Sequence, residues 1–137
     1  MRDICSEFGQ LLGPHIPYDI GLAVAGMDQF VRRCKAALAS GIPGCDSVYY
    51  GHIGDGNLHL VSWVPGLSVD QQPKEEMDRI VYGLVREMGG SVSAEHGIGT
   101  LKKKWLRHAR SEAEIALMRT LKAALDPDGL LNPGKVI

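Results

Sequence analysis

Cysteine is scarce in this chain, and no Cys-x-x-Cys pair is present. The three cysteines, Cys5, Cys34 and Cys45, are odd in number and lack the close spacing of a disulfide framework or a thiolate zinc site. Neither kind of cysteine scaffold is therefore expected. We expect the protein to work in a reducing compartment, and the cytoplasm is the default location.

Long apolar runs and an excess of charge are also absent. The longest clearly apolar stretch, around residues 20–27, is too short to cross a bilayer, and we find no targeting signal at the N-terminus. Lys and Arg total 15 against 16 Asp and Glu, a net charge of -1. No broad basic field is therefore available for nucleic acid or an anionic membrane, and the expected partner is a small molecule or a protein.

Phosphate-binding glycine motifs are missing as well. Neither GxGxxG at the start of a helix nor GxxxxGK[ST] occurs, and the GHIGDG run at residues 51–56 lies in a predicted hairpin. The composition, 45% hydrophobic and 23% charged over 137 residues, is ordinary for a folded protein of one core. We expect residues 1–137 to form a single domain that does not hold a dinucleotide by itself.

Apolar periodicity predicts alternating strands and helices. Six segments follow in the order strand, helix, strand, strand, helix, strand: residues 18–24, 27–38, 47–53, 58–64, 74–88 and 91–93. This order predicts an α+β fold with a ferredoxin-like antiparallel sheet.

Further helical structure is expected at the C-terminus. After a short basic segment, residues 101–110, a helix begins at Ser111, which forms a capping-box pattern with Glu114. Its apolar positions predict a buried side: Leu117, Met118, Leu121 and Leu125. Proline and glycine in the tail, residues 126–135, rule out further helix there. The tail is therefore expected to serve another surface.

Two histidines of the hairpin suggest a metal site. If Asp55 and Gly56 form a two-residue turn, His52 lies directly opposite His59, with Cβ atoms about 4.5 to 5.5 Å apart. Two imidazoles at that separation can share a divalent cation. They can equally be polar residues on a solvated face.

Glu95 and His96 follow the last predicted strand. In a ferredoxin-like sheet that strand neighbours the first strand, so the loop must reach across for Glu95 to meet His52 and His59. Two histidines and one carboxylate leave a coordination position open, as in a catalytic metal site. Because adjacent residues of an extended chain point opposite ways, we expect Glu95 and His96 to do different jobs.

Three motifs in one order resemble a known family. HIGDGNLH at 52–59, SAEHGIG at 93–99 and DPDGLLNPGK at 126–135 are similar to the C-terminal part of the FAD-linked oxidases. That family includes dehydrogenases of D-lactate and D-2-hydroxyglutarate and the FAD subunit of glycolate oxidase. The resemblance implies oxidation of a 2-hydroxy acid to a 2-oxo acid, with hydride passing to FAD.

The resemblance also implies the roles of the motif residues. His52, His59 and Glu95 become ligands of a divalent metal, with zinc the expected ion. His96 becomes the general base beside the flavin, and Arg2 binds the carboxylate of the substrate.

The resemblance also concerns the C-terminal tail and the part of the enzyme that binds FAD. In the family the tail packs against an FAD-binding domain of some two hundred residues, which residues 1–137 do not contain. The resemblance implies that Asn132 and Lys135 of this tail take part in binding the cofactor. We therefore expect the chain alone to be folded, inactive and free of FAD, and to pair with itself as a homodimer through the surface that the flavin domain would cover.

Two positions bear on the substrate. Relatives specific for hydroxyglutarate have Lys before the Tyr-Asp of the first strand and Asn two residues after the second metal histidine, whereas this chain has Pro17 and Val61. A second carboxylate on the substrate would lose both polar partners. The sequence therefore favours a lactate-like acid with a less polar side chain.

Two other functions remain open on the residues alone. One is a non-catalytic metal- or ligand-binding module of ferredoxin-like fold, and the other is a stand-alone zinc hydrolase in which Glu95 or His96 activates a water molecule. An open ligand set with a further histidine beside it argues against the first. The tail motif has no role in the second.

Overall fold

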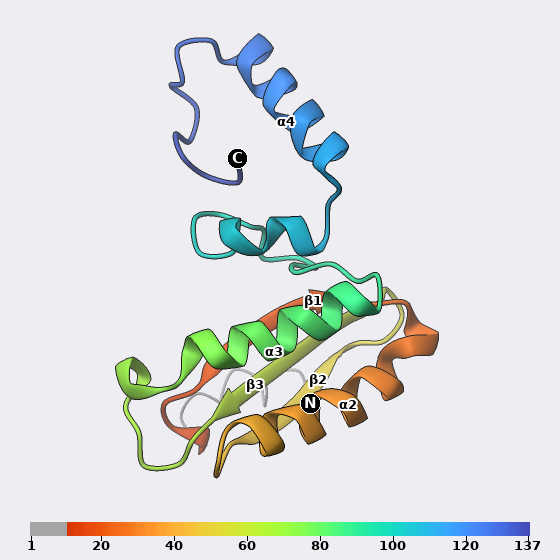
Figure 1. The fold of residues 1–137 in the computed structure, drawn as a ribbon, viewed down its shortest axis with the longest axis vertical. Helices are drawn as coiled ribbons and strands as arrows, with labels where there is room; N and C mark the ends of the chain where they lie inside the picture. Colours follow the sequence, from red (N-terminus) through yellow and green to blue (C-terminus); the bar gives the residue numbers. More distant parts are fainter. Residues whose placement is uncertain (1–10) are drawn as a thin grey trace.

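A three-stranded antiparallel sheet forms the base of the molecule. The computed structural model describes residues 11–137, so Arg2 lies outside the described residues. The sheet contains β1 (Ile16–Gly21), β2 (Asp46–His52) and β3 (Asn57–Trp63) in the order β1-β3-β2, so β3 is central (Figure 1). Together with the helices described next, this antiparallel sheet confirms the predicted α+β class.

Two helices cover one face of the sheet. The helices α2 (Met27–Gly41) and α3 (Lys74–Glu87) lie side by side on that face (Figure 1). Because strand side chains alternate between faces, alternate positions of β1 and β3 enter the core beneath the helices. The core residues with no exposed area include Ile20, Leu60, Phe30, Val81 and Val85. The opposite face of the sheet is not covered by these helices, and it carries the histidines.

The predicted fourth strand is reduced to a single bridge. Ser91 pairs with Gly21 at the edge of β1 through two backbone hydrogen bonds of 2.9 and 2.8 Å, and no ladder follows. The chain leaves that edge at Ser93, because the hydroxyl of Ser93 turns to bond with Asp19. Extended pairing therefore stops where the motif with Glu95 and His96 begins.

The register of the hairpin differs from the predicted one. His52 pairs with Asn57, and the residue opposite His59 is Tyr50. The loop between β2 and β3 therefore contains residues 53–56 and is not a two-residue turn. His52 and His59 are diagonal neighbours on one face of the sheet, not directly opposed residues.

Gly56 explains why the loop is longer. Its carbonyl accepts a hydrogen bond of 2.9 Å from the backbone N–H of Leu22, which ties the loop to the end of β1. Its φ is +78°, and a Cβ atom there would lie 2.3 Å from the carbonyl oxygen of Leu22. Only glycine fits this close approach, so Gly56 serves the contact with β1 instead of a tight turn.

The C-terminal segment extends away from the sheet. After η3 (Lys103–His108) comes α4 (Glu112–Leu125), which begins with the predicted capping box of Ser111 and Glu114 (Figure 1). Two shorter 3-10 helices, η1 (Val24–Gly26) and η2 (Val69–Gln71), precede α2 and α3. Among the described residues, no helix is long and apolar enough to span a membrane.

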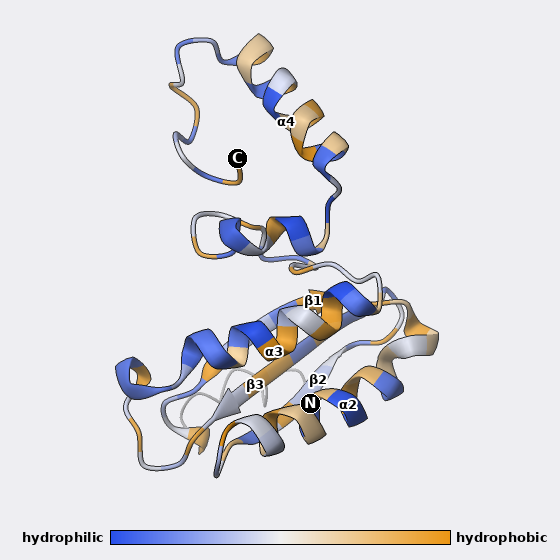
Figure 2. Ribbon diagram, viewed as in Figure 1, coloured by the Kyte–Doolittle hydropathy of each residue, from blue (hydrophilic) through white to orange (hydrophobic). Residues whose placement is uncertain are grey.

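The predicted buried side of α4 is exposed. Of its residues only Ile115 is buried, whereas Leu117, Leu121 and Leu125 are 59%, 51% and 79% exposed. The helix projects beyond the body formed by the sheet, α2 and α3, so its apolar stripe meets none of these elements (Figures 1 and 2). The prediction of a buried side was wrong. Apolar residues at helical spacing show that a helix has an apolar face, but they do not show that another part of the chain packs against that face.

Candidate functional site

The face of the sheet opposite α2 and α3 brings polar residues from all three strands into one row. Asp19 of β1 pairs with His59 of β3, and His59 pairs with Tyr50 of β2, so the three side chains project from the same face. The next row in the direction of the hairpin loop holds Asn57 and His52. His52 at the end of β2 and His59 near the start of β3 therefore share this face.

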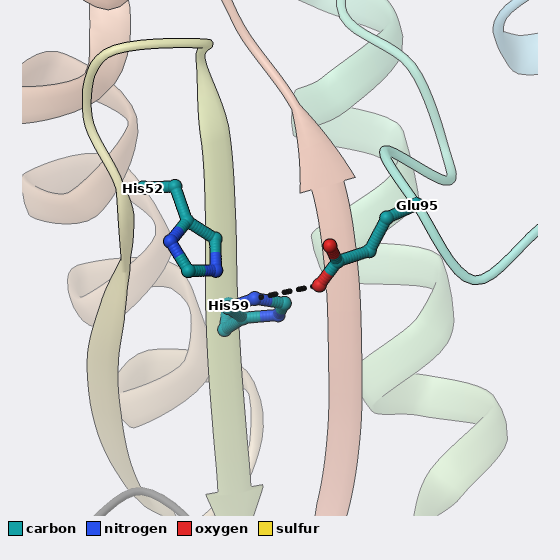
Figure 3. A group of neighbouring side chains, drawn as sticks. All are labelled: His52, His59 and Glu95. Carbon is teal, nitrogen blue, oxygen red and sulfur yellow. Dashed lines mark ion pairs between the residues drawn. The ribbon is translucent and has the colours of Figure 1, made fainter. Parts of the chain in front are cut away.

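The three predicted metal ligands come together. Potential ligand atoms of His52, His59 and Glu95 all lie within 4.8 Å of one another, and Figure 3 shows the side chains pointing into one space. Nε2 of His59 lies 3.2 Å from Oε1 of Glu95. The rings of His52 and His59 meet edge to face, with centroids 5.5 Å apart.

This arrangement fits a divalent cation. The donor set is two imidazoles and one carboxylate, which suits zinc or a similar ion and leaves positions for other ligands. His59 is only 9% exposed, whereas His52 and Glu95 are exposed. A metal held here would therefore rest against the sheet on one side and face solvent on the other.

His96 lies beside this group but outside it. Its ring stacks near that of His59, with centroids 5.8 Å apart, and its Nε2 is 3.6 Å from Oε1 of Glu95. Residues 94–97 are not extended, so the expected alternation does not apply and both Glu95 and His96 face the site. Any difference in role between Glu95 and His96 therefore rests on which of them belongs to the donor set, and not on side chains that point in opposite directions.

Asp19 is a site residue for which the sequence assigned no role. It is 1% exposed, and its carboxylate accepts hydrogen bonds from the Ser93 hydroxyl and from the backbone N–H groups of residues 94–96. Burial by itself raises the pKa of Asp19, but the bonds from the loop, those of His96 and Glu95 foremost, hold that pKa below its usual value. The carboxylate is therefore a buried anion that binds the loop.

Lys102 is a second residue that the sequence did not single out. Its ammonium group donates to the carbonyl oxygen of Asp19 and to the Ser93 hydroxyl, both at 3.2 Å. Burial lowers the pKa of Lys102, and the nearby Asp19 carboxylate opposes that shift. The sequence offered one signal for this pair, which is the acidic residue Asp19 inside an otherwise apolar strand. A buried charge requires a partner.

The tail residues do not join the metal ligands. Asn132 and Lys135 contact each other, with Nζ of Lys135 3.1 Å from Oδ1 of Asn132, and both line a hollow of about 550 Å³ between α4 and the tail. The tail is tied to the site loop through the backbone, since the N–H of Val136 donates to the carbonyl of Gly99 at 2.9 Å. Asn132 and Lys135 thus lie on a separate surface that is connected to the end of the motif loop.

Comparison with known families shows which family the chain belongs to. The model of the family described as FAD linked oxidases, C-terminal domain, matches residues 5–136. The chain belongs to this family. The motif resemblance is thereby confirmed, and the group formed by His52, His59 and Glu95 lies within the matched residues.

Several relatives of this FAD-linked oxidase domain are much longer than the chain. A D-2-hydroxyglutarate dehydrogenase of Stutzerimonas stutzeri is 39% identical over 88% of the chain, which covers 27% of that protein. The mitochondrial D-2-hydroxyglutarate dehydrogenase of Rattus norvegicus is 40% identical over 88% of the chain and 22% of its own length. A putative mitochondrial D-lactate dehydrogenase of Schizosaccharomyces pombe is 42% identical over 69% of the chain and 18% of its own. The chain therefore spans about a quarter or less of each relative.

Proposed function

We propose that this chain is the substrate- and metal-binding part of an FAD-dependent enzyme that oxidises a 2-hydroxy acid to a 2-oxo acid. The observation that carries the proposal is the convergence of His52, His59 and Glu95, with His96 beside them, on the face of the sheet opposite α2 and α3. Membership of the FAD-linked oxidases favours oxidation over the hydrolysis that the same donor set could support.

The cofactors supply chemistry that the side chains lack. When bound, a divalent cation provides a Lewis acid that lowers the pKa of the substrate hydroxyl, and FAD provides the hydride acceptor. His52, His59 and Glu95 would hold the cation. The chain's own contribution is to orient the substrate and to move its proton.

His96 is the residue we assign to proton removal. Its ring lies next to His59 without belonging to the three-residue ligand group, and 65% of its side chain is exposed, so a substrate can reach it. Neutral imidazole accepts a proton near neutral pH, as general base catalysis requires. Arg2, outside the described residues, would bind the substrate carboxylate.

The exposed leucines of α4 and the tail suggest where the rest of the enzyme packs. Leu117, Leu121 and Leu125 of α4 and Leu130 and Leu131 of the tail are all more than half exposed. We assign this leucine surface, with Asn132 and Lys135 beside it, to contact with the FAD-binding domain. In the isolated chain the same surface is available for pairing into a homodimer.

The compartment remains the one that the cysteines suggested. Among the described residues, Cys34 and Cys45 are free thiols. Burial raises the pKa of the Cys34 thiol to about 11, which keeps the thiol protonated and unreactive. The proposal of a reducing compartment such as the cytoplasm rests on the number and spacing of the cysteines.

Flavin reduction tests the proposed function. In the full-length flavoprotein, anaerobic addition of D-lactate or D-2-hydroxyglutarate is expected to bleach the oxidised flavin absorbance, because hydride leaves C2 of the acid. The purified 137-residue chain serves as the control and should contain no stoichiometric FAD. Failure of both acids to reduce the flavin, or FAD retained by the chain alone, would contradict this assignment.

A neighbouring row of residues on the sheet bears on the side chain of the 2-hydroxy acid. Pro17, which is exposed, and Val61, which is only 2% exposed, are paired directly across β1 and β3, next to the row of Asp19 and His59 and on the same face. Neither residue can bond to a second carboxylate. The names of the relatives point to hydroxyglutarate, but this row supports our proposal of a less polar, lactate-like substrate.

Exchanging that row should change the preference. In the full-length enzyme, Pro17→Lys combined with Val61→Asn is expected to raise kcat/KM for D-2-hydroxyglutarate relative to D-lactate by about tenfold or more, because a charged partner becomes available. Steady-state kinetics with both acids measure the ratio. The original enzyme should prefer lactate, and an unchanged ratio in a variant with normal metal content would show that this row does not contact the substrate side chain.

A further inference from the structure

The carboxylate of Asp19 organises the loop that carries Glu95 and His96. Its Oδ2 atom accepts hydrogen bonds from the Ser93 hydroxyl at 2.9 Å and from the backbone N–H groups of residues 94, 95 and 96 at 3.1, 3.0 and 2.8 Å. Successive N–H groups that converge on one anion form a concave site and fix the backbone that donates them. The conformation of this loop is therefore set by β1.

Apart from their contacts with His59, the side chains of Glu95 and His96 have little packing of their own. The side chain of Glu95 is 49% exposed and that of His96 is 65% exposed. Exposed side chains gain few contacts that would favour one direction over another. The direction in which Glu95 and His96 point therefore depends on the backbone that Asp19 holds.

Lys102 completes this arrangement from the other end of the motif. Its Nζ is 3.8 Å from Oδ2 of Asp19 and bonds to the Ser93 hydroxyl, and its side chain is only 16% exposed. An opposite charge and several hydrogen bonds offset the cost of keeping the Asp19 carboxylate ionised away from water. The segment from Ser93 to Lys102 is thus attached to β1 at both ends.

We propose that Asp19, supported by Lys102, is a positioning residue of this site. It holds Glu95 at the distance a shared ligand requires and holds His96 beside His59 before metal or substrate binds. The inference rests on the proposed function for the nature of the ligand, but the control of the loop by Asp19 can be measured without it. Groups that orient metal ligands affect metal affinity without touching the metal.

Asp19→Asn tests the role of the carboxylate with nearly the same shape. The amide is neutral, so its oxygen accepts the bonds that converge on Oδ2 without the negative charge that strengthens them, and the attraction to Lys102 is lost. Zinc affinity of the 137-residue chain, measured by calorimetry, is expected to fall by roughly 10- to 100-fold. Unchanged affinity would overturn the proposal.

Asp78 offers a matched control. It is also a buried carboxylate, 2% exposed, but it accepts a hydrogen bond of 2.9 Å from the Tyr18 hydroxyl and pairs with Lys74, away from the loop. Asp78→Asn is expected to lower the thermal stability and to leave zinc affinity within about twofold. If both variants lose zinc affinity equally, Asp19 acts only through general stability and the proposal is wrong.

A double-mutant cycle separates positioning from indirect damage. If Asp19 acts through Glu95, then Asp19→Asn should have much less effect on zinc affinity when Glu95→Gln is already present. Additive effects of the two substitutions would contradict the assigned role.

Hydrogen exchange tests the loop without any metal. In the metal-free chain, the amides of residues 94–96 should be protected, and Asp19→Asn should lower that protection while leaving the amides of β3 unchanged. If Asp19→Asn does not fold, Ser93→Ala removes one of the four bonds and should weaken the same protection. Protection that is undiminished in the folded variant refutes the inference. If the unsubstituted chain shows protection but binds no zinc, only the proposed metal site fails.

Discussion

His59→Ala is expected to eliminate stoichiometric zinc binding by the chain. His59 is the central residue of the proposed ligand group, since it contacts Glu95 at 3.2 Å and the ring of His52 at 5.5 Å between centroids. Without it, two exposed ligands remain on separate segments. The loss of affinity should therefore exceed the roughly 10- to 100-fold that changes around a metal site usually cause.

Calorimetry and elemental analysis of the zinc-supplemented chain measure this effect. His15→Ala is the matched control, because His15 bonds to the carbonyl of Gly13 and does not belong to the ligand group. That variant should bind close to one equivalent of zinc. Folded, unsubstituted protein that shows neither zinc nor heat on titration would count decisively against the site, and full binding by His59→Ala would remove His59 from it.

The sequence predicted the face of the hairpin better than its register. The expected pairing of His52 with His59 was wrong by two residues, because Gly56 is occupied by its contact with Leu22. A strand has a side-chain period of two, so an error of two residues leaves every side chain on the same face. His52 and His59 therefore lie on one face as predicted, although neither has the cross-strand partner that was predicted.

The approach of the loop to the hairpin could not be read from topology. The ferredoxin-like order places residues 91–93 beside β1, on the opposite side of β1 from β3. Asp19 lies between them and draws the loop over the sheet through its hydrogen bonds. A charged residue in an apolar strand was visible in the sequence, but the identity of its partners was not, since these come from residues more than seventy positions away along the chain.

Reduction of the flavin should be slowed by about 10²- to 10⁴-fold in the full-length His96→Ala enzyme, the usual contribution of a general base. Because His96 stacks near His59 without joining the ligand group, metal content should stay near normal. Stopped-flow measurement of flavin absorbance gives the rate, and elemental analysis gives the metal. His52→Ala is the informative comparison, since that variant should lose the metal as well as the rate.

Added imidazole distinguishes a base from a ligand or a spacer at position 96. The exposed position of His96 leaves an opening that a small base can enter when the ring is removed. Imidazole should therefore restore part of the lost rate in His96→Ala, in proportion to its neutral form, while the metal content stays unchanged. If His96→Ala loses metal, His96 is a ligand and our division of roles with Glu95 is wrong. If metal and rate both remain normal, proton removal belongs to another group.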